Sequence, residues 1–323
     1  MEVVTFGETV ALLSAPEGRR LGNISSLSVG IGGAESNVAI ALSRLGIACT
    51  WMGRVGADSF GDLVVREIPA EGVHVVAHRD DTGRTAVMVK EHPSGRPCRI
   101  WYYRHDSAAS RLTPQDLDEG EIAAAGVFHL TGITAGLGPG SLWAVRWAIE
   151  VARLANTLVS FDVNYRASLW SVHEASPVLR DLVARSHIVF AGLTEAALVL
   201  SGTPAAPAGN DPWMLGEKLA HEIAALGPTR VVIKLGSHGA LSLCDGEVHR
   251  ADAHRVTVID PVGAGDAFVG GYLSELVHDR PAATCLRTGN RLGALVCAAR
   301  GDWEGLPDRY GLDGLEADGE AER

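Results

Sequence analysis

Short apolar runs alternate with longer amphipathic stretches along most of this chain. The short runs end in polar or glycine residues, as buried strands do, and lie at 3–8, 49–56, 127–132, 158–164, 187–192 and 230–236. The stretches with helical periodicity lie between them, at 36–46, 141–155 and 212–227. Strands alternating with helices predict an α/β fold, with a mostly parallel sheet covered by helices on both faces. Ligands bind at the carboxyl ends of the strands in such sheets, so the polar residues there are candidates for chemistry.

One region departs from this alternation. Residues 85–104 form two extended segments around the Pro93-Ser94-Gly95 turn, a pattern that predicts a hairpin. Together with residues 10–30, the hairpin could form a small β-sheet that projects from the main domain as a lid. A hairpin at the edge of the main sheet accounts for the same pattern equally well.

Composition and charge narrow the class of protein. The 323 residues are 46% hydrophobic, enough for one large domain, which we expect over residues 1–310, with an acidic, disordered tail at 311–323. A net charge of −11 without a long basic run argues against nucleic-acid or membrane partners. No apolar run approaches the roughly 20 residues that span a bilayer, and the N-terminus has no leader pattern. Five scattered cysteines without a CxxC pair suggest a cytoplasmic protein with reduced thiols and no structural zinc.

The segment DPVGAGDAF (260–268) carries the strongest candidate chemistry. It joins a predicted strand at 255–259 to a helix that begins near Gly265. Gly263, Ala264 and Gly265 lack bulk, so their backbone N–H groups can approach an anion at the helix N-terminus. Asp266, in the first turn, could accept the proton of an attacking hydroxyl during phosphoryl transfer. An ordinary strand-to-helix turn capped by Asp266 explains the same residues more simply.

A second glycine pair opens the first predicted helix. Gly32 and Gly33 permit close approach of the backbone to a ligand, and the Asn37 amide can donate to and accept from sugar hydroxyls. A glycine turn with Asn37 facing solvent is the simpler alternative. The chain contains neither GxxxxGK[ST] nor GxGxxG, which argues against a P-loop enzyme and a dinucleotide oxidoreductase.

Together, GGAESN and DPVGAGDAF resemble the two signatures of the ribokinase-like, or PfkB, family of carbohydrate kinases. The resemblance extends from Val3 to Pro307, where 301–307 is similar to the family's terminal strand and turn. It implies a three-layer α/β/α core with a small lid, ATP as phosphoryl donor and Mg²⁺ as cofactor. It also implies that Asp266 is the catalytic base and that residues 263–266 form the anion hole.

Two arginine-bearing segments bear on the substrate. Tyr102, Tyr103 and Arg104 end the second lid segment, and Arg166 follows a core strand. Two guanidinium groups in one cleft suit a carboxylate, which they bind bidentately, better than a neutral sugar. A single arginine, by contrast, is more often a surface charge.

The strings YYRxxSAAS, HLTGI and FDxNxR resemble the 2-keto-3-deoxygluconate kinase branch of the family. This resemblance implies that Gly33, residues 102–104 and Arg166 contact a sugar acid, which is converted to its 6-phosphate. Met88 departs from the branch, because several members carry a substrate-binding tyrosine there. Kinases for 5-dehydro-2-deoxygluconate, fructose or a ribose-type sugar, and a catalytically silent binding protein, are the alternatives.

The family resemblance also places the nucleotide and the metal. It assigns phosphate, ribose or adenine contacts to the following residues: Asn164, Lys234, Gly236, Ser237, Gly239, Gly263, Gly265 and Asn290. Glu195 is expected to act on Mg²⁺ through water, although Gly192 replaces the asparagine of the family's NxxE segment. Lid strands of this family often pair between subunits, so a homodimer or higher homo-oligomer is possible.

Overall fold

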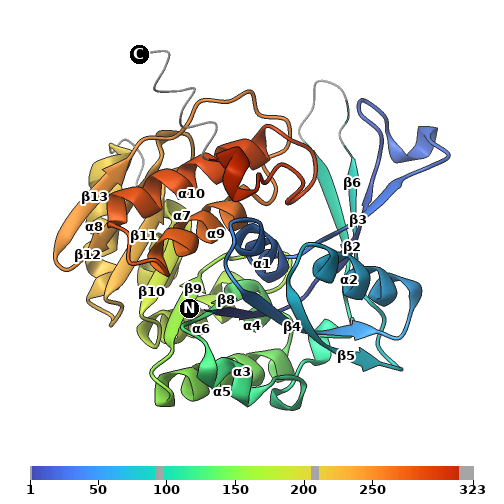
Figure 1. The fold of residues 1–323 in the computed structure, drawn as a ribbon, viewed down its shortest axis with the longest axis horizontal. Helices are drawn as coiled ribbons and strands as arrows, with labels where there is room; N and C mark the ends of the chain where they lie inside the picture. Colours follow the sequence, from blue (N-terminus) through green and yellow to red (C-terminus); the bar gives the residue numbers. More distant parts are fainter. Residues whose placement is uncertain (1, 92, 94–97, 205–210, 313–323) are drawn as a thin grey trace.

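The computed structural model describes residues 2–91, 93, 98–204 and 211–312, and its largest element is a nine-stranded sheet (Figure 1). The strand order is β13-β12-β11-β10-β9-β8-β1-β4-β5. All neighbours are parallel except β11–β12 and β12–β13. The strands are β1 (Val3–Phe6), β4 (Cys49–Gly56), β5 (His74–Asp80), β8 (Val127–Thr131), β9 (Leu158–Asp162), β10 (Ile188–Gly192), β11 (Arg230–Lys234), β12 (Ala240–Cys244) and β13 (Glu247–Ala251).

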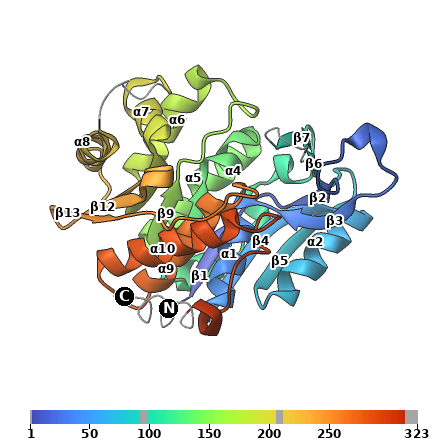
Figure 2. The same ribbon diagram turned by 90° about the horizontal axis from the view of Figure 1, so that it is seen from above.

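Helices cover both faces of this sheet (Figure 2). One face carries α1 (Ala34–Arg44), α2 (Ser59–Ala70), α9 (Ala264–Leu276) and α10 (Ala282–Cys297). The other face carries α3 (Glu119–Ala124), α4 (Gly132–Gly136), α5 (Pro139–Leu154), α6 (Val172–Ala184), α7 (Leu193–Ser201) and α8 (Pro212–Ala224). A separate hydrophobic core fills each interface, which confirms the predicted three-layer α/β/α fold. Within the described residues, no helix is both long and apolar enough to cross a bilayer.

Two segments predicted as strands are irregular instead. Residues 255–259 form no strand, because their apolar side chains do not pack into the sheet: Val258 and Ile259 are 60% and 49% exposed. Residues 301–307, expected to include a terminal strand, form bends and a turn. Nearly all of the predicted acidic tail lies outside the described residues, as do Ser94 and Gly95 of the hairpin turn. Leu312, near the end of the described chain, is buried.

The predicted small sheet is confirmed: a separate four-stranded sheet, called the lid below, lies beside the main sheet (Figure 1). Its order is β3-β2-β6-β7, with strands β2 (Val10–Ser14), β3 (Ser28–Gly32), β6 (Val87–Glu91) and β7 (Arg99–Tyr103). Residues opposite each other across the strands share a face, so Leu12, Met88 and Tyr102 lie on one side. That side faces the carboxyl ends of the main strands, because Met88 and Tyr102 line a cavity there.

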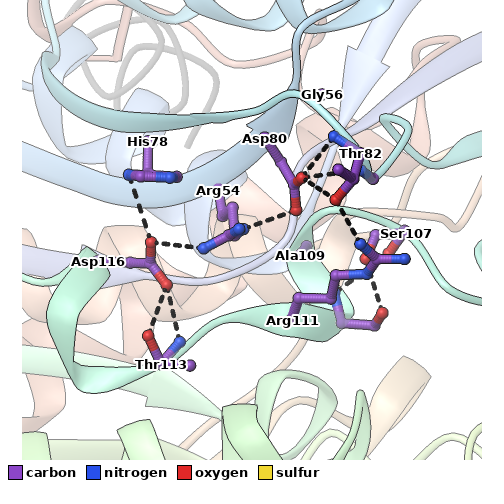
Figure 3. Close-up of polar contacts among 12 residues, drawn as sticks. Arg54, Gly56, His78, Asp80, Thr82, Ser107, Ala109, Arg111, Thr113 and Asp116 are labelled. Atoms are coloured by element: carbon purple, nitrogen blue, oxygen red, sulfur yellow. Dashed lines mark hydrogen bonds and ion pairs between the residues drawn. The ribbon is translucent and has the colours of Figure 1, made fainter.

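A polar network holds the base of the lid hairpin (Figure 3). The Arg54 guanidinium on β4 lies 2.9 Å from carboxylate oxygens of both Asp80 and Asp116. Thr82 donates to Asp80 at 2.8 Å and accepts from Arg111 at 2.7 Å. Although burial opposes it, hydrogen bonds from the following turn hold the pKa of Asp80 well below its usual range. The chain is therefore anchored to the main sheet both where it enters the hairpin and where it returns.

Candidate active site

A cavity of about 530 Å³ lies between the lid and the carboxyl ends of the main strands. Its lining combines lid residues, such as Met88 and Tyr102, with residues from the two glycine motifs, such as Asn37 and Asp266. The carboxyl ends of β9 and β11 contribute further polar residues. The architecture thus brings together segments from four distant parts of the chain, as expected for strand ends in a parallel sheet.

Asp266 is held at the floor of this cavity by two amides. Asn37 donates to its Oδ2 at 2.8 Å, and Asn164 lies 3.5 Å from its Oδ1. The backbone N–H of Gly33 donates to the Asn37 side-chain oxygen at 3.4 Å, which fixes the orientation of the amide. Burial raises the pKa of Asp266 to about 7, against the opposing effects of the Asn37 hydrogen bond and the Arg166 charge. The carboxyl group is therefore suited to accept a proton near neutral pH.

The turn before Asp266 leaves open space beside the first backbone amides of α9. Gly263 is the N-cap, and its φ of 81° lies in the left-handed region that favours glycine. A Cβ on Gly263 would lie 1.9 Å from the backbone oxygen of Asp302. A Cβ on Gly265, in contrast, would have the Lys234 ammonium at 3.7 Å as its nearest neighbour. This arrangement can receive an anion at the N-terminus of α9.

A partly buried ion pair, which the sequence did not predict, stands beside this turn. Asp162, at the end of β9, accepts from Lys234 at 2.6 Å, and its other oxygen is buried without a hydrogen-bond partner among the described residues. Although burial opposes it, the Asp162 charge raises the pKa of Lys234, which remains a cation at neutral pH. Glu195 accepts from the backbone N–H groups of Tyr165 and Gly192, at 3.1 and 2.7 Å. Gly192 therefore fixes Glu195 through its backbone, without a side chain.

The unsatisfied Asp162 oxygen and the nearby Glu195 carboxylate are the features that fit a magnesium ion. Both residues line the cavity. Mg²⁺ in phosphoryl-transfer sites binds one or two carboxylates, phosphate oxygens and several waters, rather than a cage of protein ligands. The described residues contain no group of three or more His, Cys, Asp or Glu side chains that could hold a metal ion.

The two predicted arginines both line the cavity, but they differ in their partners. Arg104 lies 2.8 Å from Oε2 of buried Glu8 and stacks over the Tyr102 ring at 4.4 Å. Glu8, which the sequence reasoning missed, also accepts from Ser107 at 2.8 Å. Arg166 forms no ion pair within the described part of the chain; it donates to the backbone of Tyr165 at 3.3 Å. Arg166 is thus the arginine whose charge is available to a ligand.

Two of the predicted contacts lie elsewhere. Tyr103 is 68% exposed and belongs to the opposite face of the lid, because successive side chains of a strand alternate. Asn164 was expected to contact the nucleotide, but it lines the cavity beneath the lid. Its φ of 37° turns the chain at the end of β9, which aims the amide at Asp266.

A second cavity, of about 650 Å³, opens on the other side of the glycine turn. Most residues predicted for the nucleotide line it: Lys234, Gly236, Ser237, Gly239, Gly265 and Asn290. Ala264 lines it too, whereas Gly263 lines the first cavity. The Asn290 amide donates to the backbone oxygens of Ala251 and Asp252, at 2.9 and 3.1 Å, so it supports the wall of the cavity.

Among the described residues, the two cavities share only three lining residues, Lys234, Pro261 and Gly265. Their junction is therefore at the N-terminus of α9, one residue before Asp266. A donor in the second cavity and an acceptor in the first would approach each other at this point, beside a carboxylate that can take a proton.

Residues 1–309 match the family described as pfkB family carbohydrate kinase. The chain is 34% identical to the 2-dehydro-3-deoxygluconokinase of Bacillus subtilis (strain 168), over 97% of this chain and 94% of that protein. It is 33% identical to the 2-dehydro-3-deoxygalactonokinase of Haloferax volcanii, over 93% and 92% respectively. The crystal structure of 2-dehydro-3-deoxygluconokinase from Thermotoga maritima matches it with a TM-score of 0.90 and 27% identity, covering 98% of this chain and 99% of that chain. This chain therefore belongs to the pfkB family of carbohydrate kinases, enzymes that transfer a phosphoryl group to an alcohol.

Proposed function

We propose that this enzyme transfers the γ-phosphoryl group of ATP to the 6-hydroxyl of 2-keto-3-deoxygluconate. The observation that carries this substrate is the Arg166 guanidinium, which lines the cavity beneath the lid and forms no ion pair with the described residues. A cation so placed can bind the substrate carboxylate bidentately. The B. subtilis and T. maritima relatives, both named as kinases of this sugar acid, support the same substrate.

The sugar acid lies between the lid and the main sheet in this proposal. Arg166 binds its carboxylate, and the backbone at Gly32 and Gly33 allows the sugar to approach the start of α1. Tyr102 contributes its hydroxyl, while Arg104, already paired with Glu8, orients Tyr102 by stacking on its ring. The hydroxyl at the far end of the substrate then lies near Asp266.

Asp266 takes the proton of that hydroxyl as the new oxygen–phosphorus bond forms and the bond to the leaving ADP breaks. The amides of residues 263–265 and the N-terminus of α9 stabilise the charge on the transferred group. Lys234 adds a positive charge at the junction of the cavities. A magnesium ion, held through Asp162, Glu195 and the nucleotide phosphates, would supply further charge neutralisation. The lid excludes water, so that the sugar receives the phosphoryl group.

The test is ADP release with Mg-ATP and a panel of acceptors: 2-keto-3-deoxygluconate, 2-keto-3-deoxygalactonate, 5-dehydro-2-deoxygluconate, fructose and ribose. We expect the highest kcat/KM with a 2-keto-3-deoxy acid, and a loss of that preference in Arg166→Ala. A neutral sugar turned over best by the unaltered enzyme would refute the carboxylate assignment and leave the role of Asp266 intact. No ADP release with any of these acceptors would favour a binding protein instead.

A second copy of the chain is the partner we propose for the outer face of the lid. Val29 and Trp101 lie in one cross-strand row on that face, and Tyr103 follows two residues later on the same side. They are 57%, 37% and 68% exposed, which is unusual for three large apolar side chains on one small sheet. Light scattering after gel filtration tests this: we expect a dimer that Tyr103→Lys with Trp101→Lys dissociates, whereas a monomeric native protein would refute it.

A further inference from the structure

Lys90, which the proposed mechanism does not use, is completely buried in the lid strand β6. Its ammonium group lies 3.0 Å from Oδ2 of Asp260 and also contacts Oδ1 of Asp302. Although burial opposes it, the charges of the two carboxylates raise the pKa of Lys90, so the cluster contains a cation. Lysine is almost never fully buried unless it is paired, and only three lysines occur in the whole chain.

Asp260 connects this ammonium group to the turn at the start of α9. Its Oδ1 accepts from the backbone N–H of Val262 at 3.1 Å, while its Oδ2 faces Lys90. The Asp260 backbone N–H, in turn, lies 3.2 Å from the carbonyl oxygen of Cys297 at the end of α10. A single carboxylate thus fixes both the entry to the turn and its distance from the lid strand.

Asp302 connects the same ammonium group to both glycine motifs. A Cβ on Gly263 would lie 1.9 Å from its backbone oxygen, and one on Gly32 would lie 2.5 Å from its Oδ2. Asp302 therefore packs directly on the turn before Asp266 and on the end of lid strand β3. Moving its carboxylate would disturb the two segments that form the acceptor and phosphoryl sites.

The backbone of Lys90 is also held firmly within the lid sheet. The carbonyl oxygen of Lys90 accepts from the backbone N–H of Ala15 at 2.9 Å, which ties β6 to the end of β2. Lys90 pairs with Ile100 across the hairpin and lies two residues from Met88. Both of these neighbours line the cavity beneath the lid, in which the sugar is proposed to bind. The position of the ammonium group is consequently set by the same strands that cover the sugar.

We propose that Lys90 is a positioning residue for phosphoryl transfer, whose ammonium group holds the turn at 260–265 in its anion-binding shape and ties that shape to the position of the lid. This inference rests on the proposed role of that turn as the anion site. Removing the ammonium group leaves two buried carboxylates that repel each other, so the turn and the segment around Asp302 should separate. The amides at 263–265 would then be misplaced for the transition state, while the wall of the second cavity at Asn290, where we expect the nucleotide, would be unaffected.

The experiment compares Lys90→Met with a matched control, Lys218→Met, whose lysine is a 69% exposed surface residue. The double variant Lys90→Met with Asp302→Asn keeps the net charge of the cluster at −1, because one cation and one carboxylate are lost together, and guards against misfolding. Kinetics are measured well below the melting temperature of each variant. We expect Lys90→Met to lower kcat about a hundredfold, comparable to the loss of one transition-state donor. Its KM for ATP should stay within threefold of the native value.

A purely structural role would lower the melting temperature but leave kcat per folded molecule within threefold of the native enzyme, and that result would overturn the proposal. Addition of n-propylammonium to Lys90→Ala should restore kcat at least tenfold, because Asp302 borders the cavity through which the ion can enter. Tetramethylammonium, which has no N–H donor, should not; equal responses to the two ions would also overturn it. All variants are assayed with the acceptor that the native enzyme uses best. A wrong sugar-acid assignment is then recognised from the acceptor panel and does not alter this test.

Discussion

The ionisation of Asp266 should govern both the rate and the stability of the enzyme. With a pKa of about 7, its carboxyl group is ionised in about a tenth of the molecules at pH 6 and in about nine tenths at pH 8. If Asp266 is the base, kcat/KM should rise about tenfold over this range and level off above it. Initial rates with ATP and sugar both well below KM report the free enzyme, to which this pKa applies.

Stability provides an independent reading of the same pKa. Burial raises it from 3.8 to about 7, so the folded state binds a proton that the unfolded state releases between these two values. Native stability from this group is therefore fully present below pH 3.8 and is lost as the pH rises through 7. The full loss is about 4 kcal/mol, since each unit of pKa shift corresponds to about 1.4 kcal/mol.

The matched variant is Asp266→Asn, which keeps the shape of the side chain and cannot ionise. Turnover should fall by about 10² to 10⁴, the usual contribution of a general base. The variant should gain stability relative to the native enzyme as the pH rises, and its advantage at pH 8 should exceed that at pH 5 by about 2–3 kcal/mol. Urea unfolding of both proteins at the two pH values measures this difference.

A flat kcat/KM between pH 6 and pH 8.5 would refute the reasoning about the base. An equal stability difference between the two proteins at pH 5 and pH 8 would refute the raised pKa itself. The second measurement contains no nucleotide, so ionisation of ATP cannot imitate the expected result.

The following substitutions test other parts of the site. Arg166→Ala should raise KM for the sugar acid about 10- to 100-fold, because a charged hydrogen bond contributes about 1.5–3 kcal/mol; an unchanged KM would contradict the carboxylate contact. Arg104→Ala should instead lower the melting temperature, since it leaves a buried acid without its cation. Gly263→Ala should prevent normal folding through its clash with the C-terminal segment, whereas Gly265→Ala should fold and lose kcat; equal melting temperatures would contradict this. Tyr103→Ala should leave kcat and KM per subunit within twofold of the native values, since Tyr103 faces away from the cavity beneath the lid.

The fold could be predicted because each strand and helix leaves its pattern in a short segment of the sequence. Each core strand is a short apolar run that ends in polar residues, and the intervening helices have their own periodicity. The strand prediction at 255–259 was wrong for a related reason. An apolar run that lines a cavity has the composition of a strand, although it forms no ladder of strand hydrogen bonds. The position of Tyr103, by contrast, could have been predicted, since strand alternation places Tyr102 and Tyr103 on opposite faces.

The charged clusters could not be predicted, because they join residues that are remote in the chain. Lys90 and Asp302 are 212 positions apart, and nothing near Lys90 in the sequence distinguishes it from a surface lysine in an amphipathic strand. Glu8 is similarly separated from Arg104, and their pairing depends on how the lid docks on the main sheet. Motifs thus indicate which residues are candidates for the chemistry, while the partners that orient those residues depend on tertiary packing.

The narrow junction between the two cavities has a consequence for how such an enzyme can diversify. Since only three of the described residues line both cavities, mutations on the lid strands can reshape the first cavity while leaving the far wall of the second untouched. Lineages that acquire a new sugar need not re-evolve their use of the phosphoryl donor. The same separation makes the lid a natural place for directed evolution, in which libraries at positions such as Met88 and Ile100 would change the choice of acceptor and spare the catalytic turn.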